Sequence, residues 1–176
     1  MNLTMEWTHI KQNLSNRFPY LTDADLNEFL AITEIKELKA NEHFIKRDSL
    51  KKKVGLVLKG LLRGYYINEV GNETTIFFWQ ENTFVSTWEA MLLKKPCTQN
   101  IETIEPSVLL IFDYEKLKEL MQSSPKIEKG YLETSQFVLA KSLYQLQTFL
   151  HEKPEKRYEY FVKELGFFSD RIPQKY

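Results

Sequence analysis

Apolar residues recur at intervals of three and four at the start of the chain, which predicts a first helix with an apolar face of Trp7, Ile10 and Leu14. Pro19 interrupts this pattern. A second helix is expected after a capping residue, Thr22 or Asp23, because short polar side chains bind the free backbone N–H groups of a first turn. The apolar residues of this second helix are Leu26, Phe29 and Leu30.

Between residues 33 and 113 the pattern changes to short runs rich in β-branched and aromatic residues, which are typical of strands. The expected strands lie at 35–38, 44–45, 56–58, 61–67, 74–79, 99–104 and 108–112. Gly60 and the turn at 69–72 predict tight hairpins between consecutive strands. About seven or eight short strands without βαβ alternation indicate a sandwich or a roll closed on itself, and argue against a Rossmann-type sheet.

Helical periodicity returns after residue 113. Asp113 is expected to cap a short helix over 114–121, and Ser124 with Pro125 to begin a long one. One stripe of the long helix has spacings of 4, 3, 4, 3 and 4, the seam of a coiled coil: Leu132, Gln136, Leu139, Leu143, Leu146 and Leu150. A second face, Tyr131, Val138 and Tyr144, is expected to lie on the β domain.

The leucine stripe has two interpretations. It is either ordinary core packing or the interface of a homodimer. About 26 residues after Pro125 span roughly 40 Å, which exceeds what a small roll covers alone, so length favours the homodimer.

Another helix is predicted from Pro154 to Gly166, a residue placed to end it. The segment from Arg171 to Tyr176 has the pattern of one more helix, with Pro173 in its first turn. Because the sequence stops there, we expect that helix to be incomplete.

Composition narrows the possible functions. The 176 residues are 43% hydrophobic, enough for a real core, and 24 basic residues balance 24 acidic ones. Nothing in this balance requires nucleic acid or an anionic membrane. Cys97 is the single cysteine, which excludes an internal disulfide and suits a reducing cytoplasm. No apolar run approaches the roughly 18 residues of a membrane span, so we expect a cytoplasmic protein with no membrane partner.

Catalytic and metal-binding patterns are missing from the sequence. His9, His43 and His151 lie far apart, and no His-x-His pair, P-loop or Gly-x-Ser-x-Gly occurs. Cys97 has no neighbouring histidine or arginine that would activate its thiol. We therefore expect no enzyme activity, no metal and no cofactor.

Four stretches in this order resemble the Crp/Fnr family of bacterial transcription regulators, specifically its shorter Bacteroidetes-type members. They are Val54–Ile67, Val70–Phe78, Ile104–Ile111 and Arg171–Tyr176. The similarity covers about residues 20–176. It implies an α+β fold: a jelly-roll-like β-roll of the cyclic-nucleotide-binding type, flanked by N-terminal helices and followed by a long dimerisation helix and a short helical C-terminal part.

The resemblance also implies a domain division. Residues 1–122 would form the sensor domain, 123–151 the dimerisation helix, and 152–176 the start of an incomplete DNA-binding domain. The family's recognition helix lies beyond the position of Tyr176, and the net charge from residue 152 onward is about +1, too low for a phosphate-binding patch. DNA is therefore expected as a partner of a full-length form only.

Nucleotide-binding members of the family carry Phe-x-Gly-Glu and, about ten residues later, an arginine for the cyclic phosphate. Here Phe84 is kept, but Ser86, Thr87 and Cys97 stand at the glycine, glutamate and arginine positions. A buried phosphate needs a fixed counter-charge, so cyclic AMP and cyclic GMP are not expected to bind. The candidate pocket of this degenerate cassette is Phe84, Ser86, Thr87, Trp88, Glu89, Cys97 and Thr98.

Two outcomes stay open for this pocket: a less anionic small-molecule effector, or a pocket filled by its own side chains such as Trp88 and Met91. Two functions also stay open. The first is a dimeric Crp/Fnr-like transcription regulator. The second is a stand-alone ligand-binding or dimerisation module with no DNA-binding role, and reading the coding sequence past the codon of Tyr176 distinguishes them.

Overall fold

The protein is described here by a computed structural model that covers residues 3–173. Two helices come first, α1 (Leu3–Arg17) and α2 (Asp23–Ala31). Thr22 caps α2 in a reciprocal arrangement: its Oγ1 accepts from Asp25 N at 3.3 Å, and its own N–H donates to Asp25 Oδ2 at 2.7 Å. Of the two alternatives for the cap of this helix, Thr22 and Asp23, the structure confirms Thr22.

Within residues 3–173, eight strands form two four-stranded antiparallel sheets. The first sheet has the order β1 (Thr33–Leu38), β8 (Ser107–Asp113), β3 (Lys53–Lys59) and β6 (Phe84–Val85). The second has the order β2 (His43–Ile45), β7 (Asn100–Thr103), β4 (Leu62–Ile67) and β5 (Glu73–Trp79). The α+β class and the β-roll are confirmed.

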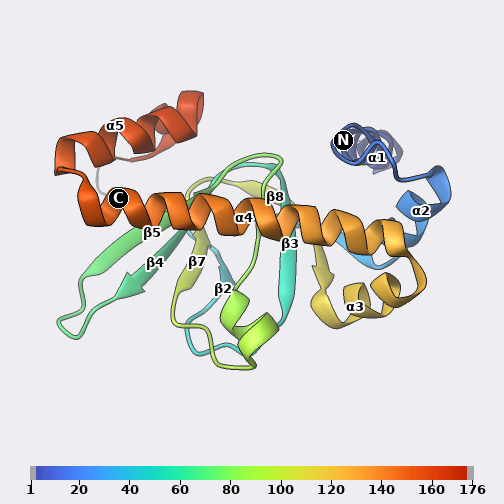
Figure 1. Ribbon diagram of the computed structural model, residues 1–176, viewed down its shortest axis with the longest axis horizontal. Helices are drawn as coiled ribbons and strands as arrows, with labels where there is room; N and C mark the ends of the chain where they lie inside the picture. The colour runs from blue at the N-terminus through green and yellow to red at the C-terminus, as the bar shows by residue number, and fades with distance from the viewer. Residues whose placement is uncertain (1–2, 174–176) are drawn as a thin grey trace.

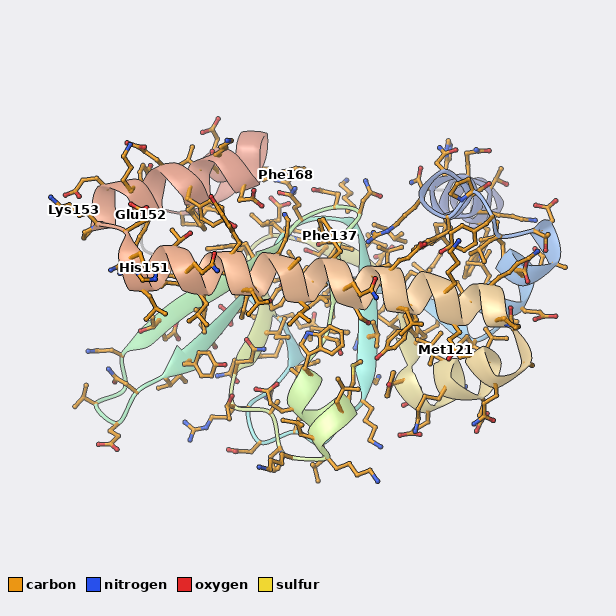
Figure 2. All side chains as sticks on the ribbon, viewed as in Figure 1. Met121, Phe137, His151, Glu152, Lys153 and Phe168 are labelled. Atoms are coloured by element: carbon orange, nitrogen blue, oxygen red, sulfur yellow. The ribbon has the colours of Figure 1, made fainter. Side chains whose placement is uncertain are left out.

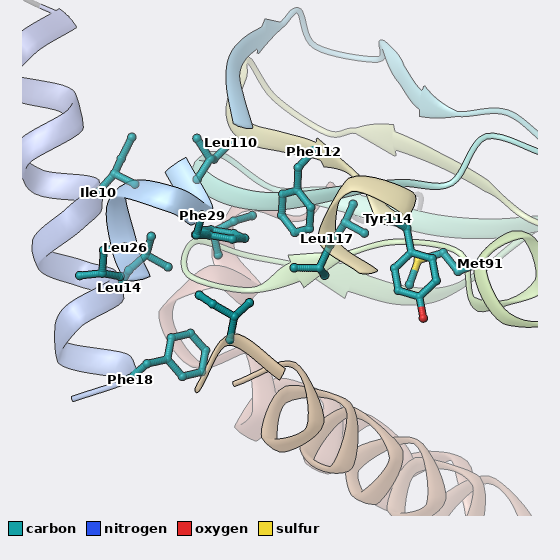
Figure 3. Close-up of a cluster of buried hydrophobic side chains, with 13 residues drawn as sticks. Ile10, Leu14, Phe18, Leu26, Phe29, Met91, Leu110, Phe112, Tyr114 and Leu117 are labelled. Carbon is teal, nitrogen blue, oxygen red and sulfur yellow. The ribbon is translucent and has the colours of Figure 1, made fainter. Parts of the chain in front are cut away.

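Alternation along β8 creates two hydrophobic clusters. Leu109 and Ile111 face the second sheet, whereas Leu110 and Phe112 face the helices. Figure 3 shows Leu110 and Phe112 beside Phe29, near the side chains of α1 and α2. One strand therefore joins the core of the roll to the core beneath the helices.

The hairpin predictions were half right. β4 and β5 pair directly across the turn at 69–72, as expected. The strands on either side of Gly60 do not pair, because β3 hydrogen-bonds to β8 and β6 while β4 hydrogen-bonds to β7 and β5. Gly60, with φ of +106°, turns the chain from one sheet to the other. The two-residue strand β6 was missed because Phe84–Val85 is too short to show a periodicity.

Three helices follow β8: α3 (Tyr114–Ser123), α4 (Pro125–His151) and α5 (Pro154–Leu165). The predicted caps are confirmed, since Asp113 accepts from Glu115 N at 2.8 Å and Ser124 accepts from Ile127 N at 3.4 Å. In Figure 1, α4 crosses the whole β-roll, with α1, α2 and α3 near its start and α5 near its end.

The chain reverses direction after α4, at the turn where Figure 2 labels His151, Glu152 and Lys153. Helix α5 then returns along α4, and a 3₁₀ segment, Gly166–Arg171, follows it. Tyr144 was expected on the β domain, but its ring lies 5.1 Å from that of Tyr160 on α5. Tyr144 contacts α5 and not the β domain because α5 packs against the side of α4 that carries Tyr144. The predicted last helix extends over residues 174–176, which lie outside the described residues.

Candidate functional site

A cavity of about 180 Å³ lies between the β-roll and α4. Its floor includes Val54 on β3 and Phe112 on β8. Helices α1 and α2 close one end, and the strand β5 contributes Phe77 and Trp79. The cavity therefore lies on the face of β8 that carries Phe112, between the β-roll and the helices.

Three of the seven candidate pocket residues line this cavity: Phe84, Ser86 and Trp88. Ser86 Oγ donates to the carbonyl of Lys53 at 2.9 Å, which fastens β6 to β3. Met91, on the π-helix Glu89–Leu93, also lines the cavity. Trp88 and Met91 therefore both lie in the wall of this cavity.

The other four candidates lie outside the cavity lining. Thr87 is fully buried, and its hydroxyl has no hydrogen-bond partner within residues 3–173. Glu89 Oε1 accepts from Thr98 Oγ1 at 2.9 Å, so these two side chains bind each other. Cys97 is buried with its Sγ 3.0 Å from the carbonyl oxygen of Lys46, and burial raises the pKa of its thiol. A raised thiol pKa is the opposite of what a reactive cysteine needs.

Sequence reasoning missed two groups of lining residues. The first is Gln99, which is 5% exposed and whose Oε1 has no hydrogen-bond partner in the described part of the chain. The second is a row on α4 at intervals of four: Gly130, Thr134, Val138 and Ser142. This four-residue spacing is present in the sequence, and its member Val138 was expected to lie on the β domain.

The lining carries no charge: among the described residues, only apolar, aromatic and neutral polar side chains border the cavity. Arg17 approaches the wall, with its guanidinium carbon 4.9 Å from the centre of the Phe84 ring. Its Nη1 donates to the carbonyl of Asn82 at 2.7 Å, and burial lowers its pKa. Lys94 and Lys95, which are near Cys97 in sequence, are exposed. A buried phosphate would therefore meet no counter-charge in this lining.

The predicted seam of α4 lies on another face of the helix. Its five leucines are 49–70% exposed, and Gln136 is exposed as well. The intramolecular-packing interpretation of the stripe is therefore wrong. Helix α5 contacts α4 through different positions, since Lys141 pairs with Glu164 at 2.6 Å. Residues 3–173 of one chain leave the seam exposed.

Within residues 3–173, no three histidine, cysteine or acidic side chains gather into a metal-binding group. In the same range, none of the helices has the length and apolar character to cross a membrane.

Comparisons with known proteins give the family. A family model for the cyclic nucleotide-binding domain matches residues 35–124. No curated protein matches the chain. Many solved structures share its fold.

Three solved structures illustrate this likeness. The sensor domain of the transcriptional regulator DNR from Pseudomonas aeruginosa has 16% identity and a TM-score of 0.63, over 84% of this chain and 95% of that one. The c-di-GMP responsive global regulator CLP from Xanthomonas campestris has 13% identity and a TM-score of 0.67, over 87% and 76%. The catabolite activator protein of Thermus thermophilus has 15% identity and a TM-score of 0.63, over 76% and 62%.

At these identities the likeness concerns the fold alone. This chain spans less than two thirds of the length of the Thermus protein. The family model, in contrast, matches the sequence itself over more than half of its 176 residues. Since that match runs from β1 through α3 and includes most of the β-roll, the chain belongs to the cyclic nucleotide-binding domain family.

Proposed function

We propose that this chain is the dimeric, non-enzymatic effector-sensing part of a Crp/Fnr-like transcription regulator. The observation that carries this proposal is the uncovered leucine seam of α4. Helix α4 has 27 residues, and its inner face borders the cavity while its outer face presents leucines at coiled-coil spacing. One helix thus offers a surface to an effector and another to a second copy of the chain.

Burial of the seam in a dimer accounts for an otherwise costly surface. A contiguous apolar stripe this long is rare on a soluble monomer and is typical of an interface. Gln136 interrupts the leucines once, and a single polar residue in such a seam fixes the register of the two helices. The DNA contact of the proposed regulator belongs to a full-length form, which agrees with the low net charge of residues 152–176.

Although the chain belongs to the cyclic nucleotide-binding domain family, our proposal does not include a cyclic nucleotide as its effector. Ser86, Thr87 and Cys97 replace the residues that the family uses for the nucleotide, and the uncharged lining supports the same conclusion. We propose that the cassette is degenerate and that cyclic AMP and cyclic GMP do not bind.

The decisive experiment is the mass of the chain in solution. Sedimentation equilibrium is expected to give about 42 kDa, twice the 21.0 kDa of one chain. The double variant Leu139→Glu, Leu146→Glu is expected to sediment as a monomer, because like charges would meet across the seam. Leu92→Glu is the matched control, since Leu92 is 51% exposed but lies on the π-helix, and it is expected to stay dimeric. A wild-type chain that sediments as a monomer would refute the dimeric sensor.

A further inference from the structure

Gln99 places an unsatisfied hydrogen-bond acceptor at the cavity. Its side chain is 95% buried, it borders the cavity, and its Oε1 has no partner within residues 3–173. Buried polar atoms are almost always hydrogen-bonded, so an exception of this kind needs an explanation. Two of the hydroxyls that border the cavity already donate elsewhere, because Ser86 Oγ donates to Lys53 O and Ser135 Oγ donates to Tyr131 O.

The fold keeps space for this amide. Gly64 on β4 faces it, and a Cβ there would lie 2.9 Å from Gln99 Oε1 and 2.8 Å from two carbons of the Trp79 ring. The absence of a side chain at Gly64 therefore lets the amide and the indole sit beside each other against the β4 backbone. Gln99 is a fixed part of the wall at this point.

The rest of the wall is aromatic. Eight aromatic side chains border the cavity: Phe18, Phe29, Phe77, Trp79, Phe84, Trp88, Phe112 and Tyr131. Aromatic rings pack favourably on one another in edge-to-face and offset arrangements. The volume of about 180 Å³ slightly exceeds that of an apolar protein cavity, ~150 Å³, that accepts benzene.

Size, charge and polarity together define a ligand class. From these three properties we propose that the cavity binds a small uncharged aromatic molecule with one N–H or O–H group, which donates its hydrogen bond to Gln99 Oε1. Phenol and indole represent this class. The inference rests on the proposed function, because it names the effector class of the same sensor, but its test is separate from the test of dimerisation.

Titration calorimetry on the full chain tests the ligand class with five compounds. Phenol and indole are expected to bind in the submillimolar range. Toluene has nearly the shape of phenol but no donor, and is expected to bind about five- to tenfold more weakly, the effect of one hydrogen bond. Benzoate and cyclic AMP are expected to give no heat, because a carboxylate or phosphate would be buried beside an uncharged wall.

Substitution of Gln99 tests the contact. Gln99→Leu is expected to weaken phenol about five- to tenfold, to the level of toluene, and to leave toluene within about twofold. Gln80→Leu is the matched control: Gln80 Oε1 is also buried without a partner within residues 3–173, but Gln80 does not line the cavity and borders an adjoining groove that shares Phe84 and Val138 with it. It is expected to leave the affinities for phenol and toluene unchanged.

A second variant covers the case in which Gln99→Leu fails to fold. Val138→Trp on α4 would fill the cavity and is expected to abolish binding of both phenol and toluene. The inference is overturned if wild-type chain binds phenol no better than toluene, if Gln99→Leu leaves that preference intact, or if cyclic AMP binds at micromolar concentration. A dimer that binds neither phenol nor indole refutes the ligand class alone, whereas a monomer that binds phenol refutes the proposed function alone.

Discussion

The guanidinium of Arg171 forms a bidentate ion pair with the carboxylate of Glu81, with Nη2 2.9 Å from Oε1 and Nη1 3.1 Å from Oε2. Arg171 also pairs with Glu105. Glu81 in turn accepts from the backbone N–H of Gly60 at 2.8 Å. Burial acts to raise the pKa of Glu81, but the hydrogen bonds from Arg171 and Gly60 outweigh it and lower that pKa. The 3₁₀ segment after α5 is thereby attached to the point where the chain passes from one sheet to the other.

Removal of this ion pair is expected to loosen α5. Arg171→Ala should reduce the free energy that holds 154–171 on the roll by on the order of 1 kcal/mol, because the paired groups remain partly hydrated. Amide hydrogen exchange should then accelerate in 154–171 and stay unchanged in the strands. Lys156→Ala is the control, since the Lys156 side chain forms an ion pair with Glu159 of its own helix at 2.6 Å. Equal acceleration in both variants would contradict the attachment.

A buried ion pair between neighbouring strands stabilises the second sheet, which consists of β2, β7, β4 and β5. Arg63 is 3% exposed, and its Nε lies 2.9 Å from Oε1 of Glu102, which is 6% exposed. Arg63→Met should lower the free energy of unfolding by about 3–5 kcal/mol, because it removes the arginine that neutralises the buried carboxylate of Glu102. The other neighbours of that carboxylate are the Tyr65 hydroxyl at 3.3 Å and His43 Nε2 at 3.7 Å. The double variant with Glu102→Leu should recover most of that loss. Urea denaturation measures both.

The control for this pair is Arg47→Met. The side chain of Arg47 is 51% exposed and its ion pair with Asp48 lies at the surface. A change below about 0.5 kcal/mol is expected there. If the double variant is as unstable as Arg63→Met, the loss comes from packing and not from the unpaired charge.

Features set by neighbouring residues were predictable from the sequence. The caps at Thr22, Asp113 and Ser124 follow from short-range chemistry, in which a side chain binds an N–H two or three residues ahead. The exposed seam of α4 follows from a spacing repeated over nearly three heptads. Both depend on nothing that is distant in the chain.

Features set by distant partners were not predictable. Gly60 was expected in a hairpin, yet the pairing of β3 with β8, some fifty residues away, places β3 and β4 in different sheets. The candidate pocket was likewise drawn from adjacent residues. Its actual lining adds Gln99 and the inner face of α4, because the path of α4 across the roll decides which buried side chains border the cavity.

Two glycine substitutions separate steric conflict from backbone strain. A Cβ on Gly60 would lie 2.8 Å from the Cα of Ser107 at a φ of +106°, so Gly60→Ala should cost about 3 kcal/mol or more. Gly71 has a φ of +87° but no atom within 4 Å of a Cβ. Gly71→Ala should cost only about 1 kcal/mol, the strain alone. Urea denaturation compares them, and equal losses would contradict the close approach at Ser107.

The stability of the contact between the start of α2 and the start of α4 should depend on pH through Asp25. Its hydrogen bonds with the Thr22 side chain and backbone, assisted by Lys126 at 3.4 Å, lower the pKa of Asp25 to about 2. The unfolded carboxyl has a pKa of about 3.9, so its contribution is present above that pH and is lost as the pH falls toward 2. Wild-type Tm should therefore fall more between pH 4 and pH 2 than that of Asp25→Asn.

The matched control for Asp25 is Asp23→Asn, because the Asp23 side chain is 88% exposed and its pairing with Lys11 lies at the surface. Thermal unfolding of this variant should follow the wild-type curve of Tm against pH. If Asp25→Asn also follows that curve, the capping carboxylate does not couple the start of α2 to the start of α4. A flattened curve for Asp25→Asn alone supports the coupling, since Asp25 Oδ1 lies 3.4 Å from the Oγ of Ser124, the residue that caps α4.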